Sequence, residues 1–306
     1  MTSLRDQLLA DRNEADSIWP RALIVQGGGM RGVYSMGALA ELERQGLSDV
    51  FDLVVGSSAG AINAAYYLAH QAESAVGIYV DQISNRSFIN PLRINKIVDI
   101  DFMIDIALKQ HLPIDESAVR LATSELKTVL TDADTAESYV VSNRSPELDI
   151  YEVFRATAAL PALYNRRVEI QGRFYVDGGV IDAVPIDIAV QAGSRLIVAV
   201  LTRKTGYRRM SHGPLFSSFG RALSRGQSRA IRNLIGKEDP RFNEAMELLE
   251  GHRETDGQMA TISIWPSDEK LLVSRTTKDK IKLAACAEMG RHDMKAALEK
   301  PIRLEL

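Results

Sequence analysis

Short apolar runs alternate with longer amphipathic stretches in the first part of the chain. The run Ala22–Val25 is too short for a helix and precedes a glycine-rich loop, which predicts a buried strand over 21–26. Apolar residues recur at helical spacing over 33–45, and Gly46 predicts the end of that helix. A second strand over 51–55 leads into an alanine-rich helix. This order predicts a parallel sheet with helices on both faces.

The remaining two thirds of the chain continue the same pattern less regularly. The stretch 74–115 is broken at Asn90-Pro91, and we expect it to be helical and to cover the functional site. Asp149 is a suitable cap for a helix that Pro161 ends. Further strands are predicted over 125–131, 139–142, 167–170, 173–176, 195–201 and 259–265, and further helices over 150–159, 185–192 and 277–300, the last with a break at Gly290.

These elements predict an α/β fold: a three-layer α/β/α sandwich with a mostly parallel central sheet. The 306 residues, 45% of them hydrophobic, suffice for one large core. We expect residues 1–20 to form an N-terminal tail or helix and 21–306 to form one domain. Its parts are a core with the sequence motifs over 21–200, a helical and basic covering segment over 203–257, and a C-terminal strand and helices over 258–306.

Composition and charge narrow the cellular setting and the partners. A net charge of −3 gives no reason to expect a nucleic-acid partner. Cys286 is the single cysteine, so no internal disulfide forms, which suits a reducing compartment. No apolar run approaches the ~20 residues of a spanning helix, and residues 1–20 lack the pattern of a signal peptide. We expect a cytoplasmic protein, and contact with the inner membrane surface stays open.

The segment Gly56–Gly60 matches the pattern G-x-S-x-G with Ser58 at its centre. A sharp turn between a strand and a helix exposes such a serine, provided that its neighbours are small. The N-terminus of the following helix favours negative charge, which suits a serine oxygen that must act as a nucleophile. The alternative is an ordinary tight glycine–serine turn, but the strand before it and the helix after it favour the nucleophile.

The loop Gly27–Gly32 also matches the dinucleotide pattern G-x-G-x-x-G after a strand. That site needs an acidic residue about 20 positions later, at the end of the second strand. Here the second strand ends in Gly56-Ser57-Ser58, which argues against a nucleotide. Three glycines can instead present bare N–H groups to the oxyanion of acyl transfer, where each donor contributes ~3 kcal/mol. A plain tight connection would need fewer glycines.

A serine nucleophile needs a proton acceptor, and Asp177 is the best-placed candidate. It follows the strand 173–176, and Gly178-Gly179 turns the chain away from it. Burial beside a serine would raise its basicity. A simple Asp-Gly turn is the alternative. The histidines that come late enough in the chain for a triad lie in polar stretches without a preceding strand, which favours surface positions: His212, His252 and His292.

Taken together, the three motifs in this order closely resemble the patatin-like phospholipases, bacterial branch. The similarity extends to 156–161 and 176–185, and covers roughly 21–200. The resemblance implies a patatin-like catalytic domain over 21–306 and hydrolysis of phospholipid or lysophospholipid acyl esters, without cofactor or metal. It implies Ser58 as nucleophile, Asp177 as base, and an oxyanion hole built from the N–H groups of Gly27, Gly28, Gly29 and Met30. Ala183 departs from the family pattern, which often has asparagine there. The rival hypothesis is a non-catalytic or regulatory lipid-binding protein on the same scaffold.

The segment 203–237 carries nine basic residues and no acidic one. Four of its arginines recur at a spacing that predicts one helical face: Arg221, Arg225, Arg229 and Arg232. Such a face is typical of a solvated surface whose charges pair with acids elsewhere. It also suits peripheral contact with anionic lipid head groups, and both interpretations stay open.

Overall fold

The computed structural model describes residues 2–10, 20–93, 95–211, 213, 220, 222–250 and 259–302. Three residues singled out in the sequence therefore lie outside the described part of the chain: His212, Arg221 and His252.

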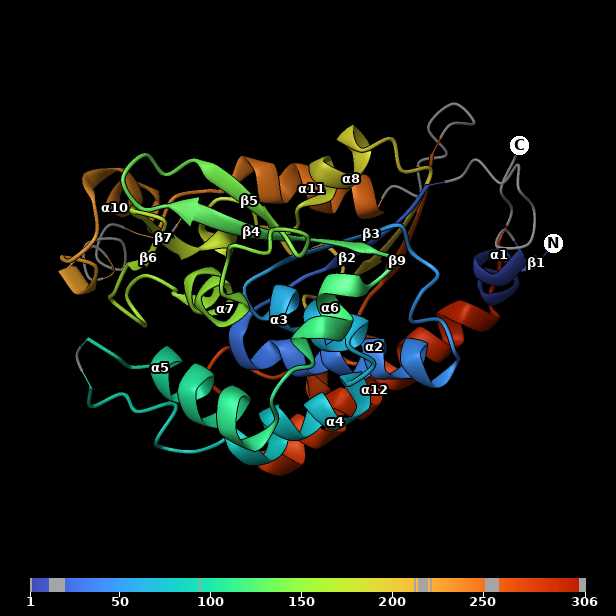
Figure 1. Ribbon diagram of the computed structural model, residues 1–306, viewed down its shortest axis with the longest axis horizontal. Helices are drawn as coiled ribbons and strands as arrows, with labels where there is room; N and C mark the ends of the chain where they lie inside the picture. Colours follow the sequence, from blue (N-terminus) through green and yellow to red (C-terminus); the bar gives the residue numbers. More distant parts are fainter. Residues whose placement is uncertain are drawn as a thin grey trace.

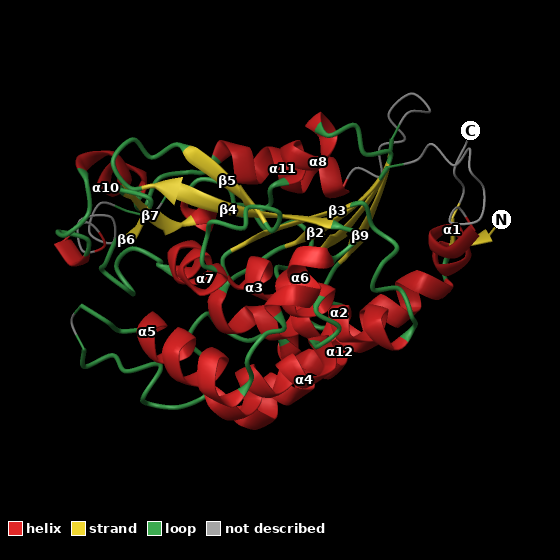
Figure 2. Cartoon of the chain, in the orientation of Figure 1, coloured by secondary structure: helices red, strands yellow, loops and turns green. Residues whose placement is uncertain are grey.

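A mixed eight-stranded sheet forms the centre of the described chain (Figures 1 and 2). Its order is β6-β7-β4-β3-β2-β8-β9, with β5 also paired to β4. The pairings among β4, β3, β2, β8 and β9 are parallel, and those that involve β5, β6 and β7 are antiparallel. The strands are β2 Arg21–Val25, β3 Leu53–Ser57, β4 Glu125–Asp132, β5 Ser138–Ser142, β6 Val168–Ile170, β7 Arg173–Asp177, β8 Leu196–Val200 and β9 Ala260–Ile264.

Strand β4 brings the ends of two other strands together. β3 runs parallel to β4 and ends with Ser57 opposite Val129. β7 runs antiparallel to β4 and ends with Asp177 opposite Leu130. Because Leu130 also pairs with β5, β7 must occupy the other edge of β4, the edge that β3 occupies. The C-terminal ends of β3 and β7 therefore meet head to head along one edge of β4.

Helices cover both faces of the sheet (Figure 1). In this view α2, α3, α4, α7 and α12 lie below the strands, and α8 and α11 lie above them. The α/β fold with flanking helices is as predicted. The helices are α1 Leu4–Ala10, α2 Gly32–Arg44, α3 Ala59–Leu68, α4 Ala72–Gly77, α5 Ile100–Phe102, α6 Glu116–Leu121, α7 Ile150–Ala158, α8 Ile186–Gln191, α10 Arg229–Leu234, α11 Pro240–Glu250 and α12 Lys280–Glu299.

Shorter elements complete the chain. Two π-helical segments, Ile78–Gln82 and Met103–His111, continue α4 and α5 within the predicted covering stretch. A short strand β1, Thr2–Ser3, pairs with β10, Pro301–Ile302, and so ties the two ends of the described chain together. Among the described helices, none combines the length and the apolar character that crossing a membrane requires.

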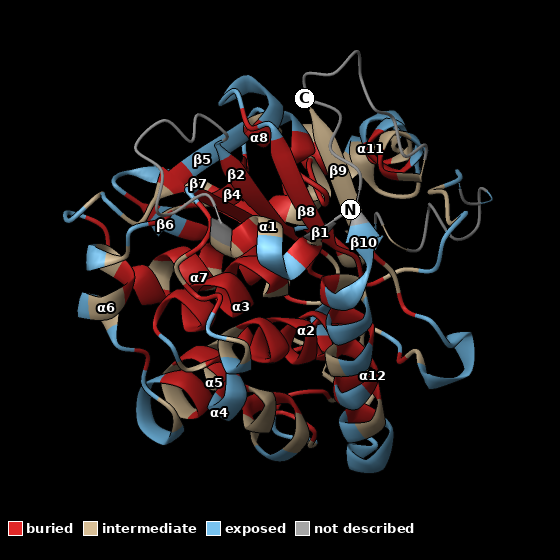
Figure 3. Cartoon of the chain, turned by 90° about the vertical axis from the view of Figure 1, so that its right-hand side faces the viewer, coloured by how far each residue is buried: buried red, intermediate tan, exposed pale blue. Residues whose placement is uncertain are grey.

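The core has two large parts, one on each face of the sheet, because the central strands are buried on both faces (Figure 3). Leu23 and Val25 of β2 point to the larger part, which α2, α3 and α12 complete. Ala22 and Ile24 of the same strand point to the smaller part, under α8 and α11. The continuous apolar run that predicted a buried strand is thus divided between two cores by the alternation of side chains.

The predicted break at Gly290 is wrong, since α12 continues through it. A Cβ atom at Gly290 would lie 2.1 Å from the carbonyl oxygen of Tyr34 in α2. A Cβ atom at Gly37 in α2 would likewise lie 2.0 Å from the carbonyl oxygen of Ala287 in α12. Both glycines therefore let the two helix backbones touch. Gly290 therefore allows α12 to pack closely against α2 and does not interrupt the helix.

The predicted arginine face is also not one helical face. The chain turns over 224–227, and Ser228 caps α10 by accepting a hydrogen bond from the Ile231 N–H. Arg225 lies in the turn, while Arg229 begins the new helix. The good N-cap residue thus starts a separate helix and breaks the spacing that the sequence suggested.

The close contact of α2 and α12 can be tested at Gly290. We expect Gly290→Ala to lower the free energy of unfolding by about 1–3 kcal/mol, because the added methyl group meets backbone atoms that cannot turn aside. The effect opposes helix propensity, which favours alanine by about 1 kcal/mol. Urea unfolding measures it.

The matched control is Gly77→Ala in α4. A Cβ atom at Gly77 would meet only the carboxylate oxygen of Asp81, at 3.9 Å. This variant should be neutral or slightly stabilised. Equal stability of both variants would show that the two helices are not in backbone contact.

Candidate active site

Ser58 occupies a strained turn between β3 and α3. Its φ and ψ are 56° and −135°, a combination that costs a non-glycine residue free energy. The neighbouring backbone is packed so tightly that only glycine fits. A Cβ atom at Gly56 would lie 2.6 Å from Cα of Ala61, and one at Gly60 would lie 2.1 Å from the carbonyl oxygen of Val25. This packing holds Ser58 at the C-terminal end of β3.

A hydrogen-bonded chain fixes the backbone of Ser58. Its N–H donates to Oγ1 of Thr157 at 2.9 Å, and that hydroxyl donates to the carbonyl oxygen of Val129 at 2.8 Å. Thr157 is fully buried in α7, so the helix connects the turn to β4. This role of Thr157 could not be predicted from the sequence, because a threonine in the interior of a helix usually carries no such signal.

Asp177 contacts the serine directly. Its Oδ2 accepts a hydrogen bond from Oγ of Ser58 at 2.8 Å, and its Oδ1 accepts one from the Gly179 N–H at 2.7 Å. The side chain is buried, and this burial raises the pKa of Asp177 to about 6. The two hydrogen bonds and the charge of Arg275 oppose the shift but do not cancel it.

The backbone of Asp177 is anchored on both sides. Its N–H donates to the carbonyl oxygen of Ala159, and its carbonyl oxygen accepts from Oγ1 of Thr131 at 2.9 Å. A Cβ atom at Gly178 would lie 2.0 Å from the carbonyl oxygen of Val129, so glycine is required after the aspartate. The Asp-Gly-Gly sequence thus lets the chain leave β7 close against β4.

The glycine loop lies against the same turn. A Cβ atom at Gly27 would lie 3.0 Å from Cβ of Ser58, and Gly28 and Gly29 have φ of 143° and 60°. Within the described part of the chain, the N–H groups of these three glycines have no hydrogen-bond acceptor. The Met30 N–H differs, because it donates to the carbonyl oxygen of Arg275 at 3.1 Å. Three of the four predicted oxyanion donors are therefore unoccupied.

The described histidines lie elsewhere. Nδ1 of His292, in α12, is 3.3 Å from Oδ1 of Asp293 and its side chain is exposed. His70 faces Asp49, and His111 contacts Gln82. None of the three is hydrogen-bonded to Ser58 or Asp177. Within the described residues, no group of three or more His, Cys, Asp or Glu side chains is placed to hold a metal ion.

A mostly apolar pocket of about 720 Å³ opens beside Ser58. One wall comes from α2 and α3, a second from residues 78–108 in and between the two π-helical segments, and a third from residues 158–164. The stretch 78–108 lies beside Ser58, as predicted, but it is helical only at its two ends: residues 84–93 and 95–99 form turns, bends and isolated bridges. Representative wall residues are Met36, Ile62, Ile83, Phe88, Met103 and Leu108.

A second, more polar pocket of about 440 Å³ also borders the serine. Ser58 and Asp177 line both pockets, so the pair stands at their junction. The glycine loop lines the polar pocket, together with four arginines: Arg31, Arg203, Arg209 and Arg275. The sequence showed a basic run that contains two of these arginines, but not that they gather here with two others.

Comparison with known proteins identifies the family. A family model described as patatin-like phospholipase matches residues 23–190, more than half of the chain. The chain belongs to the patatin-like phospholipase family. Family membership groups it with lipid acyl hydrolases, and the resemblance found in the sequence is confirmed.

The individual relatives share less than a third of their aligned residues with this chain. YjjU of Escherichia coli (strain K12), described as uncharacterized, is 28% identical over 253 residues, which are 80% of this chain and 68% of that protein. Human patatin-like phospholipase domain-containing protein 4 is 29% identical over 168 residues, which are 52% of this chain and 64% of that protein. This patatin-like chain thus spans about two thirds of the length of either relative.

A solved structure supports the fold. Human GIVD cytosolic phospholipase A2, in complex with methyl gamma-linolenyl fluorophosphonate, aligns with a TM-score of 0.53 at 11% identity. The alignment covers 96% of this chain and 62% of that chain. At this identity the likeness concerns the fold alone.

The burial of Asp177 predicts that the site lowers stability at neutral pH. The folded pKa lies above the ordinary value of 3.8, so the folded state holds a proton more tightly than the unfolded state. Stability is therefore lost as pH rises from about 4 to about 6. We expect Asp177→Asn to raise the free energy of unfolding at pH 7.5 by roughly 1–3 kcal/mol.

The extra free energy of unfolding of Asp177→Asn should be smaller by about 1 kcal/mol at pH 5, because the wild-type carboxyl is then largely protonated in the folded protein. Urea unfolding at the two pH values measures the difference. Asp81→Asn, an exposed carboxylate paired with Lys280, controls for net charge. A variant less stable than the wild type at pH 7.5 would contradict the expectation.

Proposed function

We propose that the protein hydrolyses acyl esters of phospholipids or lysophospholipids by a Ser-Asp dyad. The observation that carries this proposal is the 2.8 Å hydrogen bond from Oγ of Ser58 to a buried carboxylate of Asp177, at the junction of an apolar and a polar pocket. An acyl chain fits the apolar pocket, and the head-group side of the ester faces the polar one. Its scissile carbonyl then lies over the serine.

The residues perform the proposed reaction in two stages. Oγ of Ser58 attacks the carbonyl carbon while Asp177 accepts its proton. The N–H groups of Gly27, Gly28 and Gly29 stabilise the oxyanion, each contributing ~3 kcal/mol. Asp177 then passes the proton to the leaving alcohol, and an acyl-enzyme remains. In the second stage a water molecule attacks the acyl-enzyme, Asp177 takes its proton, and Ser58 regains one as the fatty acid leaves.

The raised pKa of Asp177 suits this task. A base works best when its pKa lies near the working pH, and about 6 is closer to neutrality than the ordinary value of 3.8. The carboxylate must be ionised to accept a proton, so activity is present above about pH 6 and is lost as pH falls through it.

The proposal predicts that Ser58→Ala and Asp177→Asn each lower kcat/KM on a short p-nitrophenyl ester by at least ~10³-fold, because each removes a group that acts in the transition state. Labelling with a fluorophosphonate should be stoichiometric in the wild type and absent from Ser58→Ala. Unlabelled wild-type protein without turnover would favour the rival hypothesis of a non-catalytic lipid-binding protein.

Two control variants sharpen this test. Ser57 is the adjacent buried serine, and its hydroxyl has no hydrogen-bond partner in the described chain; Ser57→Ala should keep most of the activity. His292→Gln should stay within a few-fold of the wild type, since loss of a true general base costs ~10²–10⁴. A thousand-fold loss in the histidine variant would overturn the dyad.

We also propose peripheral contact with anionic membrane through the basic segment, which includes Arg221. Arg225 and Arg229 are exposed, and Arg232 is half-buried nearby. Each arginine near an anionic surface contributes about 1 kcal/mol. The double variant Arg225→Gln/Arg229→Gln should therefore bind phosphatidylserine vesicles at least ~10-fold more weakly in a sedimentation assay.

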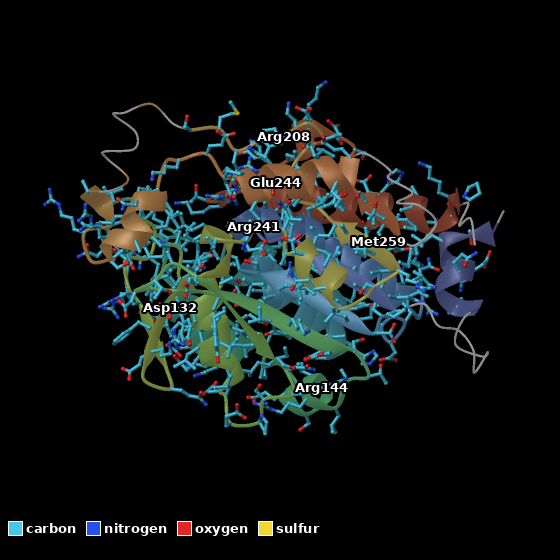
Figure 4. The ribbon with its side chains drawn as sticks, turned by 90° about the horizontal axis from the view of Figure 1, so that it is seen from above. Asp132, Arg144, Arg208, Arg241, Glu244 and Met259 are labelled. Atoms are coloured by element: carbon cyan, nitrogen blue, oxygen red, sulfur yellow. The ribbon has the colours of Figure 1, made fainter. Side chains whose placement is uncertain are left out.

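Arg144→Gln is the control for this vesicle assay, because Arg144 is exposed, lies outside the basic segment and is far from Arg208 of that segment in the view from above (Figure 4). Equal binding by wild type, double variant and control would remove the proposed membrane contact.

A further inference from the structure

The polar pocket beside Ser58 holds more positive charge than the described protein balances. Its four arginines come from separate parts of the chain: the end of the glycine loop, the segment after β8, and the loop after β9. Buried charges normally have a partner, since desolvation of an unpaired charge is costly. The partners of each guanidinium therefore show what the pocket lacks.

Arg31 is buried and has no ion pair in the described structure. Its side chain is 6% exposed, and its Nε has no hydrogen-bond partner. Its guanidinium folds back over the glycine loop, since a Cβ atom at Gly28 would lie 2.9 Å from its Nη2. Arg31 thus lines the pocket next to the proposed oxyanion donors.

Arg275 stands where the two pockets meet. Its carbonyl oxygen accepts the hydrogen bond from the Met30 N–H, and its side chain lines both pockets. Its Nε is also buried without a partner. The loop that carries Arg275 is therefore fixed to the glycine loop, while its guanidinium is left without an acceptor in the described chain.

Aromatic rings hold the other two arginines in place. The guanidinium of Arg203 lies 4.0 Å from the ring centre of Tyr207, and that of Arg209 lies 4.4 Å from the ring centre of Phe242. Arg209 also pairs with Asp239 at 2.6 Å. Arg209 therefore has a countercharge, and Arg203 has none among the described residues.

Three guanidinium groups are thus left without a carboxylate partner of their own: Arg31, Arg203 and Arg275. Burial lowers the pKa of Arg31 to about 8, and the like charges of Arg275 and Arg203 contribute to the shift. Asp177 is the carboxylate that lines the pocket, and it becomes neutral when it accepts the proton of Ser58. An incoming ligand with two negative charges would restore the balance.

We infer that this pocket binds a phosphomonoester dianion carried by the head group of the substrate, which makes an acylglycerol phosphate the preferred substrate class. The inference rests on the proposed function, since it places the ester carbonyl at Ser58. A phosphomonoester offers three acceptor oxygens and up to two charges at neutral pH, which suits several arginines. A choline or ethanolamine diester would carry one phosphate charge and bring an ammonium group among guanidinium groups.

The first test compares head groups on the wild-type protein at pH 7. The substrates are 1-acylglycerol 3-phosphate, lysophosphatidylcholine and monoacylglycerol with the same acyl chain. We expect kcat/KM on the phosphomonoester to exceed that on either of the others by at least tenfold. Equal values for the three would overturn the inference, even with a short p-nitrophenyl ester turned over normally. Failure on that neutral ester as well would instead overturn the proposed function.

The second test uses Arg203→Gln and Arg275→Gln, with Arg144→Gln as the control. Each pocket variant should reduce the preference for the phosphomonoester over monoacylglycerol by at least tenfold, mainly through a higher KM. The control should keep the wild-type preference. Preservation of the preference in both pocket variants would contradict the inference, and the head-group comparison stands if a variant does not fold.

Inorganic phosphate separates a lipid head group from a free anion. It should compete with 1-acylglycerol 3-phosphate in the wild type and compete more weakly in Arg275→Gln. Inhibition of all three substrates to the same extent, with no preference among head groups, would show a site for free anions and would also overturn the inference.

Discussion

The site depends on one constraint of the sheet: two strands of opposite direction must end at adjacent positions along one edge of β4. β3 stops opposite Val129 and β7 stops opposite Leu130, so Ser58, which follows β3, faces Asp177, the last residue of β7. Neither strand could shift by a residue without turning its buried side chains to the other face. The hydrogen bond between Ser58 and Asp177 is therefore fixed by backbone pairing, and Thr157 and Thr131 fasten its two sides.

This arrangement buries the carboxylate of Asp177, and the burial of a charged group costs free energy. Glycines at 27, 56, 60 and 178 bring backbone atoms so close together that no other residue type would fit. The same close packing buries Asp177, and this burial raises its pKa to about 6. Strain at Ser58 adds a further cost, of the kind that packed scaffolds support at functional sites. The two cores on either side of the sheet provide that support.

Much of this organisation could be predicted from local sequence. The run 22–25, the small residues around Ser58 and the Asp-Gly-Gly end of β7 each report a local backbone requirement, and local requirements leave patterns. Contacts between residues that are far apart in the sequence leave weaker patterns. Gly290 was predicted to break a helix because a contact with Tyr34 is invisible in the chain. The partner of the Met30 N–H, in a loop about 245 positions away, could not be predicted for the same reason. Arg275 likewise carries no signal until the fold brings it to the glycine loop.

The walls of the apolar pocket have a different origin from the pair Ser58 and Asp177. Ser58 and Asp177 come from the sheet, whereas much of the wall comes from the covering stretch 78–108, which is rooted in the π-helical turns rather than in any strand. π-Helical turns often occur at functional sites and depart locally from α-helical geometry. Under the proposed function, the segment that contacts the acyl chain is thus separate from the residues that cleave the ester bond. Substitutions or small insertions can therefore change the pocket wall during evolution, while the positions of Ser58 and Asp177 stay fixed by the strand register.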